Sequence, residues 1–209
     1  DALQLFEHHA RKVRPGFSLD ETEFDAFRDL CSVLDGSPLG LKLAAQWVND
    51  VSIQEIAERT RQSVDLLSRP SEPPAGRHGS LRTVFETTWR LLSDNDRFTL
   101  ARLSVCAESF DQAAALRIGE CDVASIARLR VSGMLEQQQQ HRLTMHPLVR
   151  AFAKEQLDQA ETQSSEASAS HARHYLAFLR ERFGAMASAG YGVVLDEIEA
   201  EATNIERAW

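Results

Sequence analysis

One histidine lies where an anion could bind. His146 directly precedes Pro147, and apolar residues at helical spacing follow as far as about Leu157. Proline is favoured in the first turn of a helix, where the backbone N–H groups are free and the helix dipole is positive. An imidazole beside such a turn suits contact with a phosphate oxygen. The alternative is that His146 is an ordinary polar cap that binds no ligand.

The sequence lacks the motifs of a self-sufficient enzyme. It contains no G-x-x-x-x-G-K-[ST] phosphate loop, and no apolar strand ends in an acidic pair that would hold Mg²⁺. No G-x-S-x-G elbow or Ser/His/Asp set is present. His171 and His174 are three residues apart, but no Cys or carboxylate nearby completes a tetrahedral metal set, so we expect both on the solvated surface. We therefore expect no catalysis and no bound metal or cofactor in this chain.

Composition and charge exclude several classes of protein. The net charge of −8 argues against a protein that coats nucleic acid, and only residues 80–157 carry slightly more basic than acidic side chains. No apolar run is long enough for a membrane span. Cys31, Cys106 and Cys121 show no C-x-x-C spacing, which indicates buried thiols in a reducing compartment. We expect a cytoplasmic protein, and both ends resemble boundaries within a longer chain.

The first third of the chain is predicted to be a four-helix unit, residues 1–67. The stretch from Asp35 to Pro38 supplies a helix stop, an N-cap and a first-turn proline in succession, which predicts a tight helix–turn–helix. Residues 68–79 hold three prolines and two glycines, so we predict a linker there. The apolar periodicity predicts the four helices at 2–13, 22–34, 39–47 and 53–67.

The middle of the chain, residues 80–157, has the element order of a winged helix. Helices are predicted at about 80–92, 94–106, 111–118 and 123–133, before two short strands at 134–138 and 141–145 and a closing helix. Residues 158–170 are small and polar and predict a second flexible joint, although a helix could also continue through them. The remaining residues, to 209, form two amphipathic helices that resemble the start of a tetratricopeptide-like repeat array. The predicted fold class is mainly α.

Four segments resemble, in this order, the later part of bacterial STAND ATPases, which are relatives of the NB-ARC domains of plant immune receptors. This resemblance implies that residues 1–67 are a lid over a nucleotide, that residues 80–157 dock onto the lid and the phosphates, and that residues 158–209 begin a helical sensor. The four segments are DALQLF at 1–6, LDGSPLGLKLAA at 34–45, SLRTVFETTWRLLSDNDRFTLARLSV at 80–105 and LTMHPLVRAFAKEQL at 143–157.

The resemblance also implies two nucleotide contacts. The stretch from Gly36 to Leu39 is similar to the family's G-L-P-L motif, so Pro38 and Leu39 would lie near the adenine, although Ser37 departs from the usual leucine. The stretch from Thr144 to Pro147 is similar to the M-H-D motif, so His146 would contact the β-phosphate of ADP, with Pro147 in place of the aspartate. A simpler interpretation of the first motif is a helix break with a serine cap.

The resemblance makes the chain a non-catalytic regulatory part of a signalling ATPase. ADP or ATP with Mg²⁺ would be held by a phosphate-loop domain that precedes this chain in the same protein. Further helical repeats would follow, and the intact protein could act on a protein partner or form a homo-oligomer. We expect no membrane contact.

A different class of function is a winged-helix DNA-binding regulator. Residues 123–133 would then be the recognition helix, with Arg128 and Arg130 on its exposed side and Gln137–Gln140 as the wing. Two arginines are few for this task, and Asp122 opens the helix with the wrong charge, so we do not expect nucleic acid to bind here. A third interpretation is a helical scaffold that binds a protein partner. It would account only for the C-terminal helices, residues 158–209.

Overall fold

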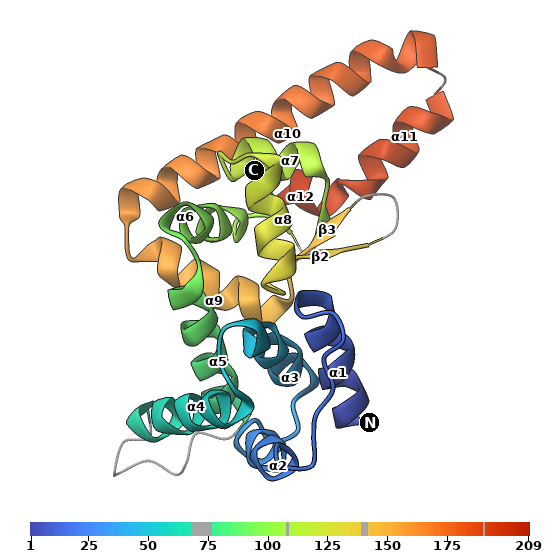
Figure 1. The fold of residues 1–209 in the computed structure, drawn as a ribbon. Helices are drawn as coiled ribbons and strands as arrows, with labels where there is room; N and C mark the ends of the chain where they lie inside the picture. The colour runs from blue at the N-terminus through green and yellow to red at the C-terminus, as the bar shows by residue number, and fades with distance from the viewer. Residues whose placement is uncertain (68–76, 108, 139–141, 190) are drawn as a thin grey trace. The chain divides into compact units, whose positions relative to one another are not determined.

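The computed structural model describes residues 1–67, 77–107, 109–138, 142–189 and 191–209 (Figure 1). The described residues are mainly helical with one small antiparallel sheet, which confirms the predicted fold class. They form two compact units: unit 1 comprises residues 1–92 with 131–133, and unit 2 comprises residues 93–130 with 134–209. Each unit is described by itself.

Unit 1 is a bundle of helices around an aromatic centre. The ring of Phe6 lies 5.2 Å from that of Phe27 and 6.1 Å from that of Phe17, measured between centroids, and Leu30 and Trp47 are buried as well. The third predicted helix is divided into an α-helix and a 3-10 turn. The elements are α1 (Ala2–Val13), α2 (Phe24–Val33), α3 (Pro38–Ala44), η1 (Ala45–Asn49), α4 (Ile53–Leu67) and α5 (Arg77–Leu91).

The predicted turn between α2 and α3 is present. The backbone N–H of Gly36 donates to the carbonyl of Cys31 at 2.9 Å, and that of Asp35 donates to the carbonyl of Ser32 at 3.1 Å. These two bonds form a Schellman motif, which places Asp35 and Gly36 at positive φ, 49° and 64°. Ser37 then caps α3 by accepting a hydrogen bond from the backbone N–H of Gly40 at 3.2 Å.

Helix α5 belongs to the same compact unit as the helices that precede it in the chain. It packs against α3 and α4, and its residues Val84 and Phe85 are buried. The sequence analysis placed residues 80–92 with the following domain, whereas the structure ends the first compact unit at Leu92. Of the predicted linker, residues 68–76 lie outside the described residues, and 77–79 form the first turn of α5.

Unit 2 contains three of the four helices predicted before the hairpin, the hairpin itself, the closing helix and the C-terminal helices. Leu100, Phe110, Leu129 and Met145 are buried in its core. The elements are α6 (Asp94–Leu103), β1 (Ser109–Phe110), α7 (Gln112–Ile118), α8 (Val123–Val131), β2 (Glu136–Gln137), β3 (Leu143–Thr144), α9 (Pro147–Asp158), α10 (Glu161–Ala189), α11 (Tyr191–Ala200) and α12 (Ala202–Arg207).

The sheet of unit 2 has three strands, in the order β1-β3-β2, all antiparallel. Thr144 of β3 lies opposite Glu136 of β2 and opposite Ser109 of β1. The predicted hairpin is therefore present with shorter strands, and β1 adds a third strand that was not predicted from the sequence. Strand β1 has two residues, which is too short to show a period-two pattern in the sequence.

Of the two alternatives for residues 158–170, the structure has a short break between α9 and α10 followed by a continuous helix. Helix α10 begins at Glu161 and continues through this segment without a break, and it packs against α7 and α9. Ala167 is fully buried, because its small side chain lets α10 approach its neighbours. Helix α11 then packs back along α10, as the orange and red helices of Figure 1 show. The tail and the winged-helix-like core form one compact unit.

Candidate functional site

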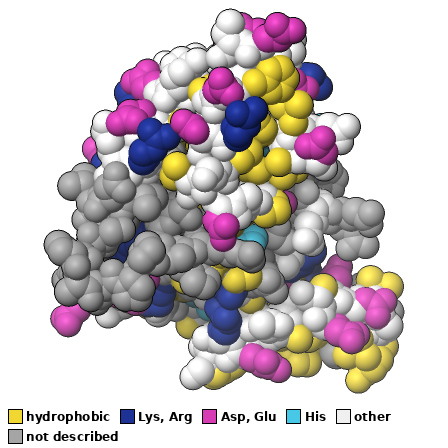
Figure 2. Space-filling model, turned by 90° about the horizontal axis from the view of Figure 1, so that it is seen from below, with side chains coloured by type: hydrophobic (Ala, Val, Ile, Leu, Met, Phe, Trp, Pro, Cys, Tyr) yellow, Lys and Arg dark blue, Asp and Glu magenta, His cyan; other side chains and the backbone are white. Residues whose placement is uncertain are grey.

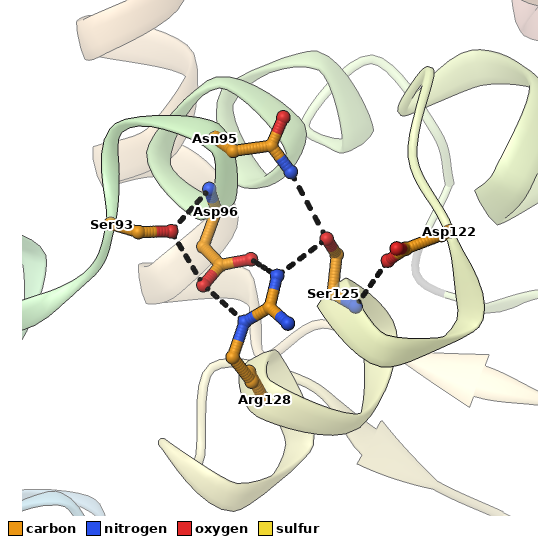
Figure 3. Close-up of polar contacts among 6 residues, drawn as sticks. All are labelled: Ser93, Asn95, Asp96, Asp122, Ser125 and Arg128. Atoms are coloured by element: carbon orange, nitrogen blue, oxygen red, sulfur yellow. Dashed lines mark hydrogen bonds and ion pairs between the residues drawn. The ribbon is translucent and has the colours of Figure 1, made fainter.

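The first polar cluster of unit 2 joins α8 to the start of α6 (Figure 3). Arg128 donates two hydrogen bonds to the carboxylate of Asp96, from Nε to Oδ2 and from Nη2 to Oδ1, each 2.8 Å long. Only 3% of the Asp96 side chain is exposed. Ser93 caps α6, and its hydroxyl also donates to Asp96 at 2.8 Å. The Arg128 guanidinium beside Asp96 holds the pKa of this carboxyl below its usual value.

Two further residues extend this cluster along α8. The hydroxyl of Ser125 accepts hydrogen bonds from Arg128 Nη2 at 2.8 Å and from Asn95 Nδ2 at 3.1 Å. Asp122 caps α8 by accepting from the backbone N–H of Ser125 at 2.8 Å. The acidic residue that argued against DNA binding is therefore the N-cap of the helix, which its position in the sequence indicates.

The two arginines suggested for DNA contact have different environments. Arg128 is held by Asp96 in a two-bond pair, although about half of its side chain is exposed. Arg130 is exposed and makes no ion pair or hydrogen bond with another described residue. Val123 and Val131, at the two ends of α8, are also exposed. The surface of α8 therefore offers one unpaired arginine among apolar side chains.

His146 is the N-cap of α9. Its Nδ1 accepts a hydrogen bond from the backbone N–H of Leu148 at 3.2 Å, and Pro147 is the first helical residue, as the sequence predicted. The imidazole is exposed. Because Nδ1 accepts, the neutral ring carries its proton on Nε2, which can donate to an anion. The geometry therefore accommodates a helix cap and a phosphate contact together.

The other two proposed nucleotide contacts lie in unit 1. Pro38 is exposed at the first position of α3, and Leu39 beside it is half-buried. Ser37 caps this helix with its own side chain, so the motif has a structural role whether or not a ligand binds. Pro38 and Leu39 belong to unit 1, whereas His146 belongs to unit 2.

A groove of about 410 Å³ in unit 2 was not expected from the sequence. Arg150 and Lys154 of α9, His171 of α10 and Arg207 of α12 line it, together with Ser104 at the end of α6. The spacing of Arg150 and Lys154 places them on one face of α9 and could have been noticed. His171 and Arg207 gave no such signal, because they come from separate helices far along the chain.

His171 corrects an expectation. The sequence suggested a solvated histidine, whereas the structure leaves its side chain only 2% exposed, and its Nε2 has no hydrogen-bond partner. Burial lowers its pKa, which favours the neutral imidazole. Among the described residues, no three His, Cys, Asp or Glu side chains are grouped to hold a metal ion.

A second buried network positions α12 beside the groove. Glu201 accepts hydrogen bonds from the hydroxyl of Tyr175 at 3.0 Å and from Asn204 Nδ2 at 2.9 Å, and it pairs with Arg142. Asn204 also accepts from the backbone N–H of Ala107 at 2.7 Å. Glu201 and Asn204 are buried, so their bonds are shielded from water. This network determines where Arg207 lies, since both residues belong to or adjoin the short helix that carries it.

Comparisons with known proteins give partial matches. No family model matches the chain. A Mycobacterium tuberculosis protein whose name assigns it provisionally to the HTH-type transcriptional regulators is 31% identical over 114 residues, which are 54% of this chain and 13% of that protein. A second protein of this organism, described as uncharacterized, is 30% identical over 122 residues, which are 58% of this chain and 31% of that protein. Mycobacterium bovis has counterparts with the same values.

The matched regions cover 13% and 31% of these two relatives, which are therefore much longer than the regions that match. The similarity is compatible with a part of a regulatory protein. In the described parts of the chain, no helix has both the length and the apolar character needed to cross a membrane.

Proposed function

We propose that this chain is a non-catalytic regulatory segment of a transcription regulator, and that it works as part of a STAND/NB-ARC-type nucleotide switch. The name of the M. tuberculosis relative supports a role in transcription regulation. The order of the four family-like segments supports the nucleotide switch. In this proposal a phosphate-loop domain elsewhere in the protein holds ADP or ATP with Mg²⁺, and this chain couples the nucleotide state to a helical sensor.

The observation that carries the nucleotide role is the geometry of His146. Its Nδ1 accepts a hydrogen bond from the backbone N–H of Leu148, which orients the imidazole and leaves Nε2 as the nitrogen that could donate to a phosphate. A phosphate oxygen beside the N-terminus of α9 would also receive the favourable field of the helix dipole. Pro38 and Leu39, at the start of α3, would lie near the adenine.

The decisive experiment measures ADP dissociation from the intact protein that contains this chain. His146→Asn keeps an N-cap, because asparagine is among the best capping residues, but it removes the imidazole that would reach the phosphate. His146→Ala removes both. A contact with phosphate predicts ADP release about ten- to a hundredfold faster in both variants. His8→Ala, an exposed histidine on α1, is the control and should leave the rate unchanged.

Two results would refute the nucleotide role. If His146→Asn releases ADP at the parent rate, His146 is only a helix cap. If the protein that contains this chain has no phosphate-loop domain before residue 1, the switch has no nucleotide to respond to. Either result would remove the nucleotide switch from the proposal. A role in transcription regulation through direct DNA binding would remain.

The second candidate is direct DNA binding by α8 and the β2–β3 hairpin. The comparisons favour it over the nucleotide switch, because the relative's name refers to a DNA-binding class. Arg130, Gln137 and Gln138 are exposed and could contact DNA, whereas Gln139 and Gln140 of the predicted wing lie outside the described residues. Against it, Arg128 is paired with Asp96. On the face drawn in Figure 2, lysine and arginine side chains are interspersed with acidic ones rather than gathered into one field.

Fluorescence anisotropy of a labelled duplex, titrated with this chain at several salt concentrations, separates the two candidates. DNA binding predicts a saturable signal whose affinity falls steeply with salt, and Arg130→Gln should reduce the salt slope by about one counterion. Arg90→Gln, an exposed arginine on α5, is the matched control. The regulatory proposal without DNA contact predicts no binding by the parent chain at physiological salt.

A further inference from the structure

The groove of unit 2 differs from the rest of the chain in its charge. The chain as a whole carries a net charge of −8, yet the side chains that line the groove include Arg150, Lys154 and Arg207 and no acidic residue. These cations come from two helices, α9 and α12, so the fold brings them together. A concave surface lined by one sign of charge concentrates ions of the other sign.

Two of the three cationic side chains, Arg150 and Arg207, have N–H groups that could donate to a ligand. The backbone N–H of Arg150 donates to the carbonyl of His146, but its guanidinium makes no hydrogen bond or ion pair with another described residue. Arg207 uses Nη1 to donate to the carbonyl of Cys106 at 3.0 Å, which leaves its other N–H groups. Lys154 is paired with Asp158 of its own helix and contributes less. Ser104 donates its hydroxyl to the carbonyl of Ala101, so it adds no donor.

His171 is the independent observation that points to a ligand. It lines the groove, its side chain is 2% exposed, and its Nε2 has no hydrogen-bond partner. A buried polar atom without a partner costs free energy, and such atoms in folded proteins often belong to binding sites. In the tautomer that carries its proton on Nε2, this nitrogen would donate to an anion in the groove. His146 itself does not line the groove, although Pro147, the next residue, does, so the groove begins beside the N-terminus of α9.

We propose that this groove binds a small phosphorylated molecule, held by Arg150, Arg207 and His171. Guanidinium groups match phosphate geometry through two parallel N–H···O bonds, which favours phosphate over a simple halide. The volume of about 410 Å³ suits a small molecule and is too small for a folded partner. Because α9, α10 and α12 each contribute a ligand-binding side chain, an occupied site would link the C-terminal helices to the core of unit 2.

The test uses this chain and isothermal titration calorimetry at low ionic strength with pyrophosphate as the probe. The expected result is saturable binding with one site per chain. Arg150→Gln and Arg207→Gln should each weaken it about ten- to a hundredfold, because each removes charge-assisted hydrogen bonds. Arg180→Gln, an exposed arginine of α10 outside the groove, removes the same charge and should have no such effect. His171→Phe, checked for folding by circular dichroism, should also weaken binding.

A comparison of ADP with pyrophosphate identifies which kind of phosphorylated molecule binds, and several results would overturn the proposal. Tighter binding of ADP than of pyrophosphate would identify a nucleotide, and equal binding would identify the phosphate groups alone. Absence of pyrophosphate binding by the parent chain would overturn the proposal. So would equal losses in Arg150→Gln and Arg180→Gln, which would indicate attraction by general charge. Binding of a DNA duplex that Arg150→Gln weakens, without pyrophosphate binding, would assign the groove to nucleic acid instead.

Discussion

Ala107 and Asn204 are 97 positions apart in the chain, yet the backbone N–H of the first donates to the side-chain oxygen of the second at 2.7 Å. The same asparagine donates through Nδ2 to the carbonyl of Ser109 at 2.7 Å. One buried side chain therefore satisfies two backbone groups next to β1. Without the Asn204 side chain, the buried N–H of Ala107 and the half-buried carbonyl of Ser109 would lose these hydrogen bonds.

We expect Asn204→Ala to destabilise unit 2 by about 2 kcal/mol, because it leaves a buried backbone donor and acceptor without partners. Urea denaturation monitored by circular dichroism would measure the change. Asn49→Ala, at an exposed asparagine in unit 1, is the control and should change the free energy of unfolding by less than about 0.5 kcal/mol. Equal effects of the two substitutions would show that the Ala107 contact contributes little.

Asp96→Asn should destabilise unit 2 at neutral pH by about 1–3 kcal/mol, because the buried carboxylate loses its charge-assisted bonds to Arg128. Since the pKa of Asp96 is lowered in the folded state, this stabilisation is complete above the ordinary value of 3.8 and is lost as the pH falls through the lower folded pKa.

The difference in stability between parent and Asp96→Asn should therefore shrink as the pH falls below about 4, measured by thermal melts across pH. Asp25→Asn is the control, because Asp25 pairs with Arg28 on an exposed surface, where ion pairs contribute little. A difference that stays constant down to pH 2 would contradict a role for the ionised carboxylate.

His146→Ala should destabilise the isolated chain by about 1 kcal/mol, because α9 loses its N-cap, whereas His146→Asn should be close to neutral. Urea denaturation of the three proteins would measure this. The comparison separates the structural role of His146 from any contact with nucleotide, since no nucleotide is present. If both variants are as stable as the parent, the bond from Leu148 to the imidazole does not contribute to stability.

Cys106 should resist thiol reagents in the folded protein at pH 8. It is fully buried, and burial raises the pKa of its thiol far above the usual value, so almost no reactive thiolate is present. Cys31 and Cys121 are half-buried, with pKa values raised by the same cause, and should react slowly but earlier. Absorbance of a released chromophoric thiol measures the rates, and denaturant should expose all three. Rapid reaction of Cys106 would contradict its burial.

The sequence by itself determined the features that depend on neighbouring residues. The turn from Asp35 to Pro38 could be predicted because its hydrogen bonds join residues three to five positions apart, as between Gly36 and Cys31. The cap of α9 at His146 depends only on Pro147 and Leu148. Most helices followed from apolar periodicity, and the β2–β3 hairpin from two short strand-like runs.

Only the tertiary structure decided which faces meet. From the sequence, Arg128 is expected to be an exposed arginine on a helix. Its pairing with Asp96 depends on where the fold places α8 relative to the start of α6. His171 and Arg207 become neighbours in a groove because Glu201 and Asn204 anchor α12 near β1. Periodicity shows that a helix has a buried face but not what covers it, because contacts between distant segments are chosen by packing over the whole unit.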